Sequence, residues 1–220
     1  TGFLLEWGFK QSSIDVCFYT YTSPTGSILW LLVWVDDTII VDDDEGLRKR
    51  FVTDLGARFP IDDKHELEWI LGVKVSRTRK SRTLTLSQEL YVQDLCKRHA
   101  SLIDGLTKRF DSPADPKIDL SPEQSPEVGS PEWERMQRYR ADYMALIGAY
   151  LWLANVTRPE LSFIASRLAR FVSNPGAVHY SAAIRVLIYL QGSASRVLHF
   201  RPTATRPLRI FVDSDWATKF

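Results

Sequence analysis

The sequence predicts an α+β fold in which β-hairpins come first and a helical subdomain follows. Three observations carry this prediction. Apolar β-forming runs fill the first third of the chain, apolar residues recur at helical spacing after residue 134, and a proline-rich acidic stretch separates the two regions. The 220 residues are 45% hydrophobic and 25% charged, which excludes collagen-like, disulfide-framework and wholly disordered proteins.

Two hairpins are predicted near the start. Residues 14–21 alternate in polarity, a turn follows at 23–26, and residues 28–35 form an unbroken apolar run. Such a run is typical of a strand that is buried on both faces. Because a second short strand, 38–41, follows at once, Asp36 and Asp37 are expected at a tight hairpin turn.

A helix and a third hairpin come next. The helix is predicted to begin after Asp44, because Leu47, Phe51 and Leu55 recur every four residues. Residues 69–75 and 83–86 then read as two strands joined by a basic loop, and a helix capped by Ser87 follows them.

The second half is predicted to be helical. Residues 111–133 contain five prolines and six acidic side chains, which is typical of an exposed linker. The helix after it places Tyr139, Tyr143, Ile147, Tyr150 and Leu151 on one face. Pro159 is expected to begin a second helix, and a third ends near Gly192. Two short runs, 196–201 and 208–212, predict a terminal β-hairpin.

Charge is unevenly distributed although the net charge is only +1. Residues 1–66 carry a net charge of −6 and residues 111–133 of −5, whereas residues 67–110 carry +5 and residues 134–220 carry +7. Acidic and basic segments in one chain suit a site where metal-binding carboxylates face a polyanion. The alternative interpretation is solvated faces of mixed sign.

The adjacent carboxylates of Asp36 and Asp37 are the main candidates for chemistry. Ionised groups beside a core lose solvation, and a divalent cation compensates for this loss. Mg²⁺ uses one or two carboxylates and completes its shell with water and substrate phosphates. The alternative is an acidic turn, where aspartate is common because it hydrogen-bonds the local backbone.

The sequence around this pair resembles a known family. Residues 32–40, LVWVDDTII, are similar to the Tyr-Val-Asp-Asp hairpin of reverse transcriptases, with Trp34 at the tyrosine position. Further segments resemble copia-type retrotransposon polyproteins in the same order along the chain: 8–12, 15–18, 71–75, 86–91, 139–148, 157–163, 179–190 and 213–217. The resemblance therefore covers nearly the whole chain.

The resemblance implies roles for particular residues. Asp36 and Asp37 fall on catalytic, metal-binding positions, and Asp213 falls on the first carboxylate of a tethered ribonuclease H domain. The residues that fall on positions contacting primer and template are Trp34, Trp69, Leu71, Gly72 and Lys74. The implied cofactor is Mg²⁺ or Mn²⁺.

The resemblance also implies a domain organisation. Residues 1–110 would be a partial polymerase palm, 111–133 a flexible linker, 134–195 a helical thumb or connection, and 196–220 the beginning of a ribonuclease H-like domain. The implied partners are an RNA template, a DNA primer, deoxynucleoside triphosphates and the remainder of a polyprotein.

The implied function is RNA-directed DNA polymerisation by the intact protein. The family's third polymerase carboxylate lies upstream of the residues present, so the 220 residues alone are expected to be inactive. The alternative is a non-catalytic relic that keeps the fold and nucleic-acid binding. The longest apolar run has eight residues and no secretory signal opens the chain, so no membrane partner and an intracellular location, in a cytoplasmic particle or the nucleus, are expected.

The roles of the arginines in the second half, and of the histidines along the whole chain, are open to more than one interpretation. Arg158 either bonds helix ends or contacts phosphate. The candidate phosphate contacts of the predicted thumb are Arg135, Arg138, Arg140, Arg167, Arg170 and Arg185, some of which are expected to serve as solvated helix faces. The four histidines lack metal-ligand spacing and are expected to be surface or hydrogen-bonded structural residues.

Overall fold

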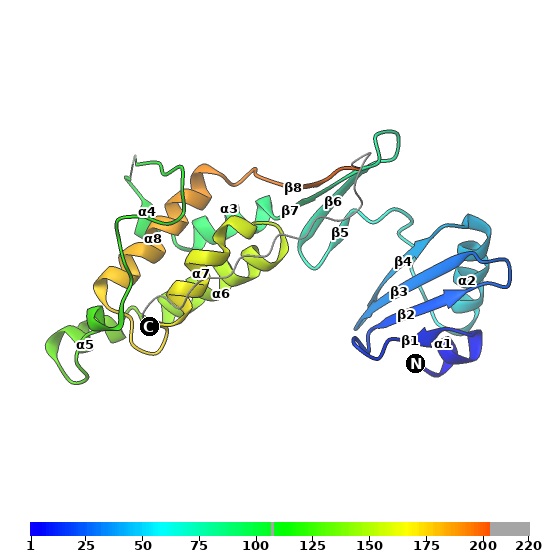
Figure 1. Cartoon of the computed structure of the whole chain (residues 1–220), viewed down its shortest axis with the longest axis horizontal. Coiled ribbons are helices and arrows are strands. Elements are labelled where there is room, and N and C mark those ends of the chain that lie inside the picture. Colours follow the sequence, from blue (N-terminus) through cyan, green and yellow to red (C-terminus); the bar gives the residue numbers. More distant parts are fainter. Residues whose placement is uncertain (107, 203–220) are drawn as a thin grey trace, which may run out of the picture. The chain divides into compact units, whose positions relative to one another are not determined.

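The structure is a computed structural model that describes residues 1–106 and 108–202. The chain divides into two compact units, Thr1–Leu67 and a second one that begins at Glu68 (Figure 1). This boundary falls inside residues 1–110, which the family resemblance implies to be one domain. The described elements are helices and antiparallel strands, which confirms the α+β prediction.

The first unit is a four-stranded antiparallel sheet with two helices. The strands are hydrogen-bonded in the order β1-β2-β3-β4. The elements of this unit are α1 (Gly2–Trp7), β1 (Lys10–Gln11), β2 (Phe18–Thr22), β3 (Ile28–Trp34), β4 (Asp37–Asp42) and α2 (Glu45–Arg58).

The core of this unit lies on one face of the sheet. Leu29 and Leu31 of β3 are buried and pack in a cluster with Leu47 and Phe51 of α2 and Leu4 of α1. The helix α2 begins as predicted, because the Asp44 carboxylate accepts hydrogen bonds from the backbone N–H groups of the first turn.

The prediction that residues 28–35 are buried on both faces is wrong. Trp30, Leu32 and Trp34 alternate with the core residues and are 44%, 37% and 52% exposed. The physical reason is that both described helices of this unit pack against the same face of the sheet. The unbroken apolar run therefore produces one buried face and one exposed apolar face.

The second unit combines another antiparallel sheet with helices. The strands β5 (Trp69–Ile70), β6 (Val73–Thr78), β7 (Thr83–Ser87) and β8 (Leu198–Phe200) are paired in sequence order. The helices are α3 (Glu89–Arg98), α4 (Ala100–Ile103), α5 (Pro131–Gln137), α6 (Arg140–Val156), α7 (Ser162–Ala169) and α8 (Ala177–Gly192), with short 3₁₀ turns at Pro122–Gln124 and Pro159–Leu161.

Two strand predictions in this unit need correction. Residues 69–75 are not one strand, because Leu71 and Gly72 both have positive φ and form a two-residue turn between β5 and β6. The predicted terminal hairpin is only partly described. β8 pairs with β7, more than 100 residues earlier, while residues 208–212 and Asp213 lie outside the described residues.

The helical core is built from α6, α7 and α8, as the periodicity predicts. Tyr143 and Tyr150 of α6 are fully buried, and their hydroxyls donate to the carbonyls of Leu168 and Ala183, both at 2.8 Å. Burial raises the pKa of the Tyr150 hydroxyl well above its ordinary value, so this group is a neutral donor.

Residues 111–133 are packed against the helices and are not a uniformly exposed linker. Leu120 belongs to the main core cluster, and Pro113 and Pro126 are buried. Asp115 and Asp119 form ion pairs with Arg185 of α8 and Arg167 of α7, at 3.0 and 2.8 Å. Two of the six acidic residues of this segment thus pair it with the basic helices α7 and α8.

Candidate functional site

Asp36 lies at the tip of the β3–β4 hairpin, as predicted. Trp34 pairs with Asp37, so Val35 and Asp36 are the two residues of the turn. Val35 has φ of 51°. This conformation is uncommon for a β-branched residue, so the turn holds backbone strain directly beside the aspartate pair.

The two carboxylates are available to a ligand. Both aspartates are exposed, and within the described part of the chain neither side chain forms a hydrogen bond or ion pair. The nearby acidic residues differ in this respect, because Asp43 accepts from the Ile28 N–H and Asp44 caps α2.

The pair fits part of a metal site. Carboxylate oxygens are the ligands that Mg²⁺ and Mn²⁺ take in proteins. Among residues 1–106 and 108–202, no group of three or more His, Cys, Asp or Glu side chains is placed to hold a metal ion. Asp36 and Asp37 therefore supply two carboxylates of a shell that needs further ligands.

An aromatic and aliphatic surface adjoins the aspartates. Residues paired directly across antiparallel strands point to the same side, so Asp37 shares a face with Trp34 and also with Trp30. Sequence reasoning selected Trp34 but missed Trp30. The available signal was their separation of four positions, which is twice the two-residue period of a strand, but the continuous apolar run concealed it.

The other predicted contact residues lie together in the second unit. Trp69 pairs with Lys74 across the β5–β6 hairpin, and Leu71 and Gly72 form its turn. Leu71 and Trp69 are close to half exposed, and Lys74 and Gly72 are also exposed. The structure therefore brings these four residues together on one hairpin, whereas Trp34, Asp36 and Asp37 belong to the first unit.

The candidate thumb arginines are used in different ways. Arg167 and Arg185 pair with Asp119 and Asp115, and Arg140 donates to the Val172 carbonyl at 3.3 Å. Arg138 and Arg170 are exposed, and the described residues offer their side chains no ion-pair partner. Half of the six candidates are thus occupied in holding the unit together.

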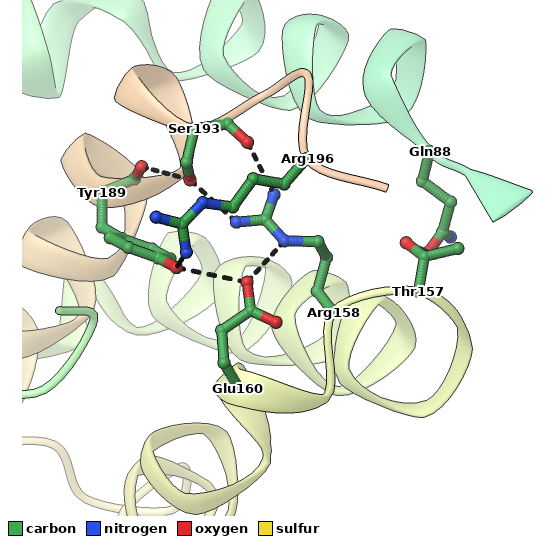
Figure 2. Close-up of polar contacts among 7 residues, drawn as sticks. All are labelled: Gln88, Thr157, Arg158, Glu160, Tyr189, Ser193 and Arg196. Carbon is green, nitrogen blue, oxygen red and sulfur yellow. Dashed lines mark hydrogen bonds and ion pairs between the residues drawn. The ribbon is translucent and has the colours of Figure 1, made fainter. Parts of the chain in front are cut away.

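Arg158 bonds helix ends, the first of the two alternatives (Figure 2). It is 1% exposed, and its guanidinium pairs with Glu160 at 2.7 Å and donates to the carbonyl and hydroxyl oxygens of Ser193 at 3.1 and 2.7 Å. The Tyr189 hydroxyl donates to Glu160 and accepts from Arg196. The network ties the start of α7 to the end of α8.

Charge–charge and hydrogen-bond interactions set the ionisation of Glu160. Burial disfavours its carboxylate, but the hydrogen bonds and charge of Arg158, with a smaller contribution from Tyr189, outweigh burial and lower the pKa of Glu160. The carboxylate is therefore held ionised against the buried guanidinium, as a structural ion pair.

Buried His179 and half-buried Cys96 lie in structural surroundings. His179 is fully buried, stacks on Phe171, accepts from the Gly176 N–H and contacts the Ser121 carbonyl. Burial raises the pKa of the Cys96 thiol to about 11, which disfavours the nucleophilic thiolate.

Among the described residues, no helix is both long and apolar enough to cross a membrane.

Comparison with known proteins establishes the relationship. The chain is 30% identical over 215 residues to the retrovirus-related Pol polyprotein from transposon RE1 of Arabidopsis thaliana, covering 98% of the chain and 14% of that protein. It is 29% identical over 198 residues to the corresponding polyprotein from transposon TNT 1-94 of Nicotiana tabacum, covering 90% of the chain and 14% of that protein. The chain is a relative of copia-type retrotransposon Pol polyproteins.

The Pol relationship confirms the resemblance predicted from the sequence, and the chain spans about 14% of the length of these polyproteins. A shorter relative also exists. An uncharacterized mitochondrial protein of Arabidopsis thaliana is 24% identical over 189 residues, which cover 86% of the chain and 72% of that protein. No protein-family model matches the chain, and no solved structure matches it significantly.

Proposed function

We propose that this chain is the part of an RNA-directed DNA polymerase that carries its metal-binding hairpin, within a retrotransposon Pol polyprotein. The observation that supports the proposal is the position of Asp36 at the tip of a strained two-residue turn, with Asp37 beside it and both carboxylates exposed. The relationship to Pol polyproteins supplies the context for this reaction.

In this proposal Asp36 and Asp37 are ligands of Mg²⁺ or Mn²⁺ during nucleotidyl transfer. Metal ions bound by them would stabilise the attacking and leaving oxygens of an in-line displacement. The remaining protein ligand of such a site would come from elsewhere in the polyprotein. The strain at Val35 supports a functional role, because costly backbone conformations concentrate at sites where position matters.

The proposed partners follow from this chemistry. They are an RNA template, a DNA primer, deoxynucleoside triphosphates and the rest of the polyprotein. Trp34 would lie near the primer end, while Trp69, Leu71, Gly72 and Lys74 would contact the primer strand. Asp213, outside the described residues, is proposed as the first carboxylate of a ribonuclease H-like domain, and the proposed location is intracellular.

A non-catalytic role is the second candidate. The shorter relative shows that a sequence of this kind also occurs in a protein only modestly longer than this chain. In such a protein the fold and a nucleic-acid surface would persist without polymerisation.

A metal titration tests the aspartate site directly. Paramagnetic Mn²⁺ is titrated into the 220-residue chain while line broadening of the hairpin amides is followed by NMR. Asp36→Asn with Asp37→Asn should abolish broadening around residues 34–38. Asp62→Asn with Asp63→Asn is a matched control, since it neutralises another adjacent acidic pair, whose members contact Lys64 and His65. Equal broadening in both double variants would refute the metal site.

A primer-extension assay separates the two functions. It uses the polypeptide extended to include the neighbouring Pol sequence, with and without Asp36→Asn. Extension that depends on Mg²⁺ and is lost in the variant supports the polymerase. Selective Mn²⁺ binding or nucleic-acid binding without any extension supports the non-catalytic candidate.

A further inference from the structure

The helix α6 has an exposed face without charged side chains. From Tyr143 to Val156 its sequence contains no Asp, Glu, Lys or Arg. One side of the helix lies in the main core cluster, while Met144 and Trp152 are 48% and 37% exposed. Helices on a protein surface normally carry charged and polar residues opposite their apolar stripe. The helix α6 therefore has a second apolar face, which the unit leaves uncovered.

The helices α2 and α3 show the usual pattern. The exposed residues of α2 include Lys49, Arg50 and Arg58, and those of α3 include Asp94 and Lys97. These charges keep the outer sides of both helices in water. An apolar face without them is typical of a surface that another molecule covers.

The outer positions of α6 follow a seven-residue repeat. Spacings of three and four residues alternate along the series Ala141, Met144, Gly148, Leu151 and Asn155. Leu151 is half-buried and the other four residues are exposed. This spacing is the one at which two helices pack along each other with side chains in the gaps of the facing helix, and a single polar Asn in the series fixes their register. The face therefore fits another helix.

The same face is symmetric about Gly148. Met144 and Trp152 lie four residues before and after it, and Ala141 and Asn155 lie seven residues before and after it. If two copies pack antiparallel and cross at Gly148, Met144 of each copy lies level with Trp152 of the other. Contacts between a methionine sulfur and an aromatic ring are favourable. No atom lies within 4 Å of a Cβ built on Gly148, so the backbone is open to close approach at the crossing point.

Charge also favours contact between identical chains at this face. Residues 134–220 carry a net charge of +7, so two copies of this part of the chain repel each other where charged surfaces meet. The outer face of α6 lets two copies approach without opposing like charges. The charged residues of this helix, Arg140 and Asp142, lie in its first turn, and antiparallel packing places them at opposite ends of the pair.

We propose that the exposed face of α6 binds the same face of a second copy of this chain, antiparallel and with two-fold symmetry. The face is defined by Ala141, Met144, Ala145, Gly148, Trp152 and Asn155. Such a contact uses the same patch on both copies. It is separate from the metal-binding hairpin and goes beyond the proposed function. One pair of helices makes a small interface, so we expect a weak dimer with a dissociation constant of roughly 10–100 μM.

Sedimentation velocity over a range of protein concentrations tests the proposal. The wild-type chain should change from monomer to dimer across the expected dissociation constant. Gly148→Glu brings two carboxylates together at the two-fold axis, and it should weaken association by about tenfold or more. The monomer tolerates this substitution, because the space around Gly148 is open and Glu is a better helix former than Gly.

Gly56→Glu is the matched control. Gly56 is an exposed residue of α2 in the first unit, so the control makes the same substitution and adds the same charge on another helix. A Cβ built on Gly56 meets only the Ile61 side chain, at an ordinary contact distance of 3.5 Å. This variant should associate like the wild type, and circular dichroism should show that neither variant melts below it.

Cross-linking tests the antiparallel arrangement. Ala141→Cys and Asn155→Cys are prepared as separate variants in a chain that also carries Cys17→Ser and Cys96→Ala. In the proposed dimer residue 141 of one copy lies level with residue 155 of the other, so a short bis-maleimide should link the two variants when they are mixed. Each variant alone should be linked poorly. Efficient linking of each variant to itself would show a parallel pair and contradict the proposal.

Each remaining outcome has a definite meaning. A wild-type chain that stays monomeric throughout the concentration range overturns the inference, and so does a dimer that Gly148→Glu leaves unchanged. Equal weakening by Gly148→Glu and Gly56→Glu would mean a general effect of charge, and the α6 interface would be wrong. If peroxide oxidises Met144 in the monomeric 220-residue chain but not in a longer Pol polypeptide, another part of the polyprotein covers the face, and the inference is wrong. None of these outcomes alters the Mn²⁺ test of the aspartate pair.

Discussion

Replacing Glu160 by Gln should strongly destabilise the second unit. The side chain keeps its shape and one acceptor oxygen, but the carboxylate charge is lost while the Arg158 guanidinium stays buried, with only 2% of its side chain exposed. Removing one partner of a buried ion pair costs about 3–5 kcal/mol because the other charge is left uncompensated. Since the Glu160 side chain is 33% exposed and partly solvated, the lower end, about 3 kcal/mol, is expected.

The assay is chemical and thermal unfolding followed by circular dichroism at a helical wavelength. For a unit of this size, about 3 kcal/mol corresponds to a fall in Tm of roughly 6–12 °C. A double variant, Arg158→Met with Glu160→Gln, removes both charges and should recover more than about 1 kcal/mol of the loss. The control is Asp94→Asn, which breaks an exposed pair with Arg98 and should cost less than about 0.5 kcal/mol.

The pH dependence of unfolding provides a second measurement. The pKa of Glu160 is lower in the folded state than in the unfolded state, so its stabilisation is fully present above the unfolded value, about 4.3, and is lost as pH falls through the folded value. The difference between wild type and Glu160→Gln should therefore shrink in acid. A Glu160→Gln variant within about 1 kcal/mol of wild type at neutral pH would refute the argument for a buried charge.

Three further substitutions test the strained turn at Val35, the packing of residues 111–133 and the close contact of Gly176 with the Gln124 backbone. Val35→Gly should stabilise the first unit by about 0.5–1 kcal/mol in urea unfolding, since it relieves a positive φ at a position that is 84% exposed; a loss would contradict strain. Asp115→Asn should cost about 1–2 kcal/mol and speed proteolysis within residues 111–121, because Arg185 loses its carboxylate; an unchanged cleavage rate would mean that the ion pair does not hold this segment. Gly176→Ala should lower stability by about 1–3 kcal/mol in thermal unfolding, because the added Cβ meets the Gln124 backbone, and a neutral effect would show that this backbone yields.

The sequence by itself determined the local elements and the place of the aspartate pair. The periods of two and of about four residues specify strands and helices through interactions between near neighbours, which explains why α2, α6, α7 and α8 were predicted. The hairpin at Asp36 was predicted for the same reason, because one β-forming run directly precedes the aspartate pair and another directly follows it. The order of motifs also predicted the relationship to Pol polyproteins, which the comparisons confirm.

Tertiary structure alone decided which surfaces are covered and which charges are used. One face of β3 is exposed because both described helices of its unit pack on the other face. An unbroken apolar run does not indicate which of its two faces the helices will cover. Arg158 is buried and hydrogen-bonded to Ser193, which lies 35 positions later in the chain. Residues 111–133 are held against the helices by the ion pairs of Arg167 with Asp119 and of Arg185 with Asp115. These outcomes depend on contacts between residues far apart in the chain, and the pairing of β8 with β7 does so as well. Local pattern fixes the elements, whereas burial and pairing follow from which elements meet.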